Sequence, residues 1–353
     1  MIEIMDDTLR EGMQTPNVMF TEKEKVLVAR NLFDAGIRRL IISYPPAHSS
    51  EQSVTRTILR EEKAQKSAVF GMGRAIVGDV EIIASTGANI ALHLPMDGTY
   101  DKALEACKYA KDRYPERKVA IGLVDVGSFA IEKLIEIAKE FDSAGVDTIE
   151  LPDTTGSLLP KKYGDIVRII KSEVSTSISA HCHNDNGLAV ANSLAAAEAG
   201  ADIIDCTVLG LGERNGIADI AVVSEALARQ GFNSGINGEK LRETYQAVDR
   251  ILHDKMGISF LSPNYPLYGS FLPIHTAGTH AEPGKFKATQ FSVNVYCGKA
   301  LIRKILLSKN IEIPDATLAK VTTKVKDECV TSGKALTYDR VQQIAEETAN
   351  QES

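Results

Sequence analysis

Two histidines separated by one residue, His181 and His183, stand at the end of an apolar run with the composition of a β-strand. Residues i and i+2 of a strand share a face, so both imidazoles are expected on one side, with Cα atoms roughly 7 Å apart. Such a pair chelates one divalent metal ion. Two hydrogen-bonded core histidines are the alternative, but the Asn-Asp-Asn-Gly turn that follows favours a metal site.

The segment 6–14, DDTLREGMQ, gathers three carboxylates around Arg10 and a glycine. One of these carboxylates would complete a His-His-carboxylate site that leaves positions open for a substrate. Arg10 beside such a metal would hold a substrate carboxylate or stabilise a developing oxyanion. An ordinary exposed turn is the alternative.

Two further segments carry residues that could take part in chemistry. The glycines of GLGERNG (210–216) resemble a phosphate-binding loop, but a dinucleotide fingerprint belongs after the first strand of its unit. A tight loop shaped by a Glu213–Arg214 ion pair is therefore expected. The segment HTAGTH (275–280) contains two histidines, which are candidates for proton transfer near neutral pH. A surface loop without a catalytic role is the alternative.

Short apolar runs alternate with longer amphipathic runs through most of the chain. The expected strands lie at about 2–6, 38–43, 68–72, 89–94, 118–124, 147–151, 177–182 and 203–208. Helices are expected near 21–35, 50–65, 78–86, 100–113, 129–144, 160–174, 187–199 and 217–230. Eight such units in about 230 residues predict a (β/α)8 TIM barrel, with a doubly wound open sheet as the alternative.

The active site of such a barrel lies at the carboxyl ends of its strands, which is where the motifs above fall. Residues 1–230 are therefore assigned to a catalytic barrel and 231–353 to a C-terminal lid and helical subdomain. In this second part, helices are expected at 239–256, 299–309 and 315–349, around a segment rich in Gly, Pro and His at 259–290.

Composition excludes several classes of protein. Lys and Arg number 40 against 47 Asp and Glu, and the net charge of −7 disfavours general binding to nucleic acid or anionic membranes. No apolar run approaches the roughly 18–20 residues of a membrane helix, and the first seven residues lack a signal-peptide pattern. Five cysteines without a CxxC pair indicate neither a disulfide framework nor a zinc knuckle, so we expect a cytoplasmic protein.

Four segments together resemble the motifs of the DRE-TIM metallolyases. These segments are DTLREGMQ (7–14), LPDTTG (151–156), HCHNDNGLAVANSLAAAEAGA (181–201) and GLGERNGI (210–217). The branch of homocitrate, isopropylmalate and citramalate synthases is the most similar, and HTAGTH (275–280) resembles its histidine-containing lid. Glu11, where many relatives have Asp, together with Ile217, is similar to the homocitrate synthase pairing.

The resemblance implies a metal-dependent acyltransferase that condenses acetyl-CoA with a 2-oxo acid and then hydrolyses the thioester. It implies a role in amino-acid biosynthesis and a homodimer in which the lids are exchanged between subunits. The ligands of the divalent metal, with Zn, Mn, Mg and Co as candidates, would be Glu11, His181 and His183. Asn184 or Asp185 would hold the histidines in place.

The same resemblance assigns the catalytic roles. Arg10 would stabilise the alkoxide and, with Gln14 and Thr154, line the substrate. His280, oriented by Asp125 and contributed by the partner subunit, would remove a proton from the thioester methyl group. The residues that bind the CoA portion are not assigned.

Some positions depart from the homocitrate synthase pattern. Strand 38–43 lacks the usual acidic residue, Ser179 stands where a glutamate is usual, and the segment 95–100 has no Arg or Lys to hold a second carboxylate. These differences set the substrate pocket apart from that of relatives that use 2-oxoglutarate. A metal-dependent lyase that runs the reverse chemistry on a hydroxy-acyl compound is the alternative function, and a non-catalytic binding protein is a third.

Overall fold

The computed structural model describes residues 2–94, 100–276 and 290–351. It divides into two compact units, Met1–Leu261 and Ser262–Ser353. The described helices include none that is both long and apolar enough to cross a membrane. All five cysteines are buried and free of disulfides.

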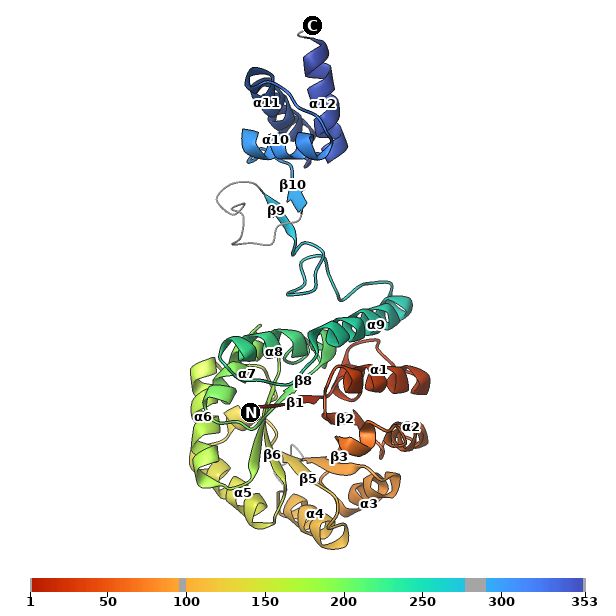
Figure 1. Ribbon diagram of the computed structural model, residues 1–353. Helices are drawn as coiled ribbons and strands as arrows, with labels where there is room; N and C mark the ends of the chain where they lie inside the picture. The colour runs from red at the N-terminus through yellow and green to blue at the C-terminus, as the bar shows by residue number, and fades with distance from the viewer. Residues whose placement is uncertain (1, 95–99, 277–289, 352–353) are drawn as a thin grey trace. The chain divides into compact units, whose positions relative to one another are not determined.

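The first unit is a closed barrel of eight parallel strands in chain order, with β1 paired to β8 (Figure 1). The strands are β1 Glu3–Asp6, β2 Arg39–Ser43, β3 Ala68–Arg74, β4 Asn89–His93, β5 Val119–Gly122, β6 Thr148–Asp153, β7 Ser177–Cys182 and β8 Ile203–Cys206. The β1–β8 pairing closes the sheet and excludes the doubly wound alternative, which would leave two open edges. The predicted TIM barrel is confirmed.

A ring of helices surrounds the barrel (Figure 1). They are α1 Glu22–Asp34, α2 Ser49–Leu59, α3 Val77–Thr86, α4 Tyr100–Arg113, α5 Ile131–Ser143, α6 Pro160–Glu173, α7 Ala189–Glu198 and α8 Ile220–Arg229, with short 3-10 turns at Glu11–Gln14, Ala64–Lys66, Val126–Ser128 and Val208–Gly210. The apolar strands are buried on both faces, as expected for parallel strands covered by helices.

Side-chain caps explain where two of the helices begin. Thr21 and Glu24 form a capping box at the start of α1. Asp219 caps α8, which starts at Ile220 rather than at residue 217. At α5 the nearby Ser128 is not a cap, since its hydroxyl donates to the carbonyl of Asp125 and the helix begins at Ile131.

Helix α9, Gly238–Met256, belongs to the first unit. It packs against α1, and the backbone N–H of Asn237 donates to the carbonyl of Ala35 across 2.8 Å. The division between the units therefore falls after Leu261 rather than after residue 230.

The described part of the second unit contains two short parallel strands, β9 Ile274–Thr276 and β10 Gln290–Ser292, and three helices. The helices are α10 Lys299–Ser308, α11 Asp315–Ser332 and α12 Tyr338–Asn350, and they share a core that includes Val293, Ile302 and Val325. The helical run expected at 315–349 is two helices, because Gly333 adopts a left-handed conformation with φ of 64° and ends α11. His275 lies on β9, while His280 lies outside the described residues.

The loop after β8 requires glycine at position 216. Gly216 has φ of 75°, and a Cβ there would lie 1.7 Å from the carbonyl oxygen of Gly210. We therefore expect Gly216→Ala to lower the free energy of unfolding by about 3 kcal/mol or more, measured by urea titration. Gly78→Ala is the matched control, since a Cβ at that helical position meets nothing within 4 Å. Equal stability of the two variants would contradict this description of the loop.

Candidate active site

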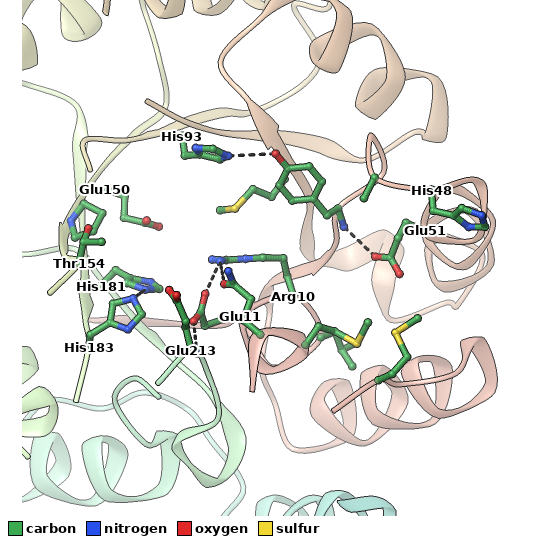
Figure 2. A pocket seen from close by; sticks show the side chains of 18 of the residues that line it. Arg10, Glu11, His48, Glu51, His93, Glu150, Thr154, His181, His183 and Glu213 are labelled. Carbon is green, nitrogen blue, oxygen red and sulfur yellow. Dashed lines mark hydrogen bonds and ion pairs between the residues drawn. The ribbon is translucent and has the colours of Figure 1, made fainter. Parts of the chain in front are cut away.

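A cavity of about 720 Å³ opens at the carboxyl ends of the barrel strands (Figure 2). It is lined by six of the residues expected from the sequence: Arg10, Glu11, Gln14, Thr154, His181 and His183. These side chains come from the turn after β1, the end of β6 and the end of β7, so closure of the barrel is what brings them together.

The two histidines face each other at the floor of this cavity. Their Nε2 atoms are 3.4 Å apart, and the Nδ1 of His181 lies 2.6 Å from Oδ2 of Asp205. Burial raises the pKa of Asp205 well above its ordinary value. Ionised Asp205, the form that a bound cation would favour, only accepts, and in that form the Nδ1 of His181 carries the proton and its Nε2 presents a lone pair. Burial, and then the neighbouring His181, lower the pKa of His183 to about 3, which keeps that ring neutral. The Nδ1 of His183 is buried and has no hydrogen-bond partner among the described residues.

Arg10 is held among acidic side chains. Its Nε donates to Asp7 across 3.0 Å, and a second N–H of the guanidinium pairs with the same carboxylate. The remaining guanidinium nitrogen donates to Glu11 across 2.5 Å and to Gln14 across 3.3 Å. These four bonds leave one of the five N–H donors of Arg10 for a ligand.

Glu11 is fixed from two sides. One carboxylate oxygen takes the bond from Arg10, and the other accepts the backbone N–H of Glu213 across 2.9 Å. Burial raises the pKa of Glu11, but Arg10 and His181 outweigh burial, and the pKa lies below its ordinary value. Gly212 makes room for this carboxylate, because a Cβ there would lie 2.9 Å from Oε1.

The donor set fits a divalent cation. Four buried carboxyl groups, those of Asp7, Glu11, Glu150 and Asp205, surround the guanidinium of Arg10. Burial raises the pKa of Asp7, Glu150 and Asp205, and a bound cation would stabilise their ionised forms. Two imidazoles with facing Nε2 atoms supply nitrogen donors beside Glu11, a combination that suits zinc, manganese and cobalt.

A second group of possible ligands lies in the same place. Ligand atoms of Asp7, His181 and Asp205 are within 4.8 Å of one another. Asp7 is already paired with Arg10, and Asp205 with the Nδ1 of His181. Because Asp205 already binds the Nδ1 of His181, its role is to orient that ligand. Asp7 and Glu11 are both bonded to Arg10, so the ligand set Glu11, His181 and His183 stays a prediction.

The structure corrects the assignment of the residues that hold the histidines. Asn184 accepts the backbone N–H of Ala189 at the start of α7, and Asp185 pairs with Arg214 across 2.8 Å. Asp205, on β8, is the residue that binds His181. The expected ion pair between Glu213 and Arg214 is confirmed at 3.0 Å.

Two expected catalytic residues are not placed in the cavity. Asp125 is not among the residues that line it, and the backbone N–H of Asp125 donates to the hydroxyl of Thr154 across 2.8 Å. His280 lies outside the described residues, so its pairing with Asp125 stays a prediction.

Several polar residues of the cavity, and Asp205 behind them, were not predicted from the sequence. Tyr44, His93 and Glu150 line the cavity, and Asp205 is fully buried. Each of Asp205, Glu150 and His93 interrupts an apolar strand. A charged or imidazole side chain inside an otherwise apolar parallel strand indicates a polar site within the barrel. The sequence contained this signal at all three positions.

A closed (β/α)8 barrel whose strand ends hold paired histidines, an arginine and buried carboxylates defines the class of this protein. The chain belongs to the HMGL-like family, whose model matches residues 1–248. It is 33% identical to a homocitrate synthase of Saccharolobus islandicus over 92% of this chain and 76% of the relative. It is 32% identical to a 2-isopropylmalate synthase of Methanocaldococcus jannaschii over 97% of this chain and 66% of the relative.

Solved structures share the fold. An HMG-CoA lyase from Bacillus subtilis matches with a TM-score of 0.66 at 19% identity, covering 74% of this chain and 96% of that one. The carboxyl transferase domain of Rhizobium etli pyruvate carboxylase, solved with pyruvate and biocytin, matches with a TM-score of 0.65 at 16% identity, covering 73% of this chain and 48% of that one.

Proposed function

We propose that this protein is a divalent-metal-dependent acyltransferase that joins the acetyl group of acetyl-CoA to a 2-oxo acid and hydrolyses the resulting thioester. The observation that carries the proposal is the convergence of His181, His183 and Glu11 beside Arg10 in one cavity. The two curated relatives named as synthases support it, since each matches more than nine-tenths of the chain.

In this proposal Glu11, His181 and His183 hold the metal. A bound divalent cation supplies Lewis-acid polarisation of the carbonyl of the 2-oxo acid. Asp205 keeps the proton of His181 on Nδ1, which leaves Nε2 of that ring as a donor to the metal.

The other residues act on the substrates. The free N–H of Arg10 stabilises the negative charge that develops on the carbonyl oxygen as the new carbon–carbon bond forms. Gln14 and Thr154 line the bound acid. His280 removes the proton from the thioester methyl group, with Asp125 orienting it and the partner subunit of a dimer contributing it. Water then cleaves the thioester, which releases a carboxylate and the CoA thiol.

The experiment is a thiol-release assay with the metal-reconstituted protein, acetyl-CoA and a panel of 2-oxo acids. We expect free CoA to appear only when both substrates are present, with one product molecule formed for each thiol. The reverse reaction is measured in parallel by supplying hydroxy-acyl compounds. Cleavage of such a compound without any condensation would replace the acyltransferase by the lyase.

A further inference from the structure

Glu150 occupies a place in the cavity that the proposed function does not use. It lies in the middle of β6, is 8% exposed, and Figure 2 shows its carboxyl group pointing into the cavity. Gly122 on β5 is its register partner, and a Cβ at Gly122 would lie 3.2 Å from Oε1 of Glu150. The absence of a side chain at Gly122 thus makes room for the carboxyl group of Glu150 in the lining of the cavity.

A tyrosine–histidine pair lines the same cavity. The Nδ1 of His93 lies 3.3 Å from the carbonyl oxygen of Leu94, and a carbonyl only accepts, so Nδ1 carries the proton. Burial lowers the pKa of His93, which favours the neutral ring. The Nε2 of His93 therefore accepts the hydroxyl proton of Tyr44 across 3.2 Å (Figure 2). With this proton committed, the Tyr44 oxygen offers a ligand its lone pairs.

The charges around the cavity disfavour a second carboxylate on the substrate. Arg10 is the one arginine or lysine among the described residues that line it, and Arg10 is bonded to Asp7, Glu11 and Gln14. A second carboxylate near Glu150 would compete with Glu150 and its acidic neighbours for the charge of Arg10, and like charges in a desolvated site repel each other. Much of the remaining wall is apolar, and includes Leu9, Met13, Met19, Met72 and Pro152.

We propose that Glu150 determines the specificity of this site, and that the substrate is a monocarboxylic 2-oxo acid whose side chain ends in a hydrogen-bond donor. The donor binds the carboxyl group of Glu150, with the Tyr44 oxygen as a second acceptor. The inference rests on the proposed function, because it assumes that the 2-oxo acid occupies this cavity. A hydroxyl and a cationic nitrogen share this donor chemistry.

The test compares kcat/KM for four five-carbon-chain 2-oxo acids in the thiol-release assay. These acids are 2-oxopentanoate, 5-hydroxy-2-oxopentanoate, 5-guanidino-2-oxopentanoate and 2-oxoglutarate. We expect the better of the hydroxyl and guanidino compounds to exceed 2-oxopentanoate by roughly 10- to 100-fold, the range of a hydrogen bond to a charged group, with 2-oxoglutarate the poorest substrate. The two donor compounds distinguish a hydroxyl from a cation.

Glu150→Gln is expected to reduce this preference at least about fivefold and to raise the relative rate with 2-oxoglutarate. Gly122→Ala is a second variant, since its Cβ crowds the Glu150 carboxyl group and should shift the same ratio. Glu225→Gln is the control, because Glu225 does not line the cavity and pairs with Arg229 on α8, and its substrate ratio should match the wild type.

Failure of the two proposals gives different results. If no 2-oxo acid releases thiol, the proposed function is wrong. If thiol is released but 2-oxoglutarate or 2-oxopentanoate is the best of the four, the inference is overturned while the acyltransferase stands. Ratios that stay unchanged in both folded variants overturn the role of Glu150. If neither variant folds, the ranking of the four 2-oxo acids by kcat/KM in the wild-type protein tests the inference by itself.

Discussion

Replacing His183 by alanine is expected to release the bound divalent cation and to lower thiol release roughly 10³-fold or more, because Lewis-acid polarisation contributes several kcal/mol to such reactions. His183 supplies one of the two facing Nε2 atoms, and its own Nδ1 has no described partner. The metal-free fold should therefore tolerate the change. Elemental analysis of the purified variant gives the metal content, and circular dichroism checks the fold.

His253→Ala is the matched control for this variant, because His253 is an exposed residue of α9 and does not line the cavity. It should keep both the metal and the activity. A folded His183→Ala protein with a full complement of metal and the wild-type rate would contradict the assignment of the ligands.

Replacing Arg10 by glutamine is the second substitution with a large expected effect, and it is expected to lower both kcat and the free energy of unfolding. Loss of the guanidinium removes the charge that faces the developing oxyanion, so kcat should fall roughly 10²- to 10³-fold. It also leaves Asp7, which is fully buried, and Glu11 without their counter-charge. Breaking a buried ion pair from one side costs about 3–5 kcal/mol of unfolding free energy, measured by urea titration.

A second substitution separates the two consequences of losing Arg10. Asp7→Asn in the Arg10→Gln background removes one unpaired carboxylate and should recover part of the stability, without recovering kcat. If the double variant regained both, Arg10 would act only by holding the fold, and its role at the oxyanion would be wrong.

Much of the barrel could be predicted from the sequence, because parallel strands buried on both faces are continuously apolar and their helices carry local caps. The fold then brought Arg10, Glu11, His181 and His183 into one cavity, as the position of each motif at a strand end indicated. These predictions succeeded because each depended on a local pattern.

The missed features depend on contacts between distant strands. Nothing local to His181 shows that Asp205, on the next strand, is hydrogen-bonded to its Nδ1, and the adjacent Asn184 and Asp185 were the obvious candidates. The space for Glu150 comes from Gly122 on a neighbouring strand, which only the register reveals. The boundary at Leu261 likewise follows from the packing of α9 on α1.

The most direct test of the central claim is thiol release from acetyl-CoA, measured on one preparation before chelation, after chelation and after a divalent metal is returned. The cluster of Glu11, His181 and His183 predicts that release stops when elemental analysis shows the metal to be gone, and that zinc, manganese, magnesium or cobalt restores it. Full 2-oxo-acid-dependent release by protein verified to be metal-free would contradict the account.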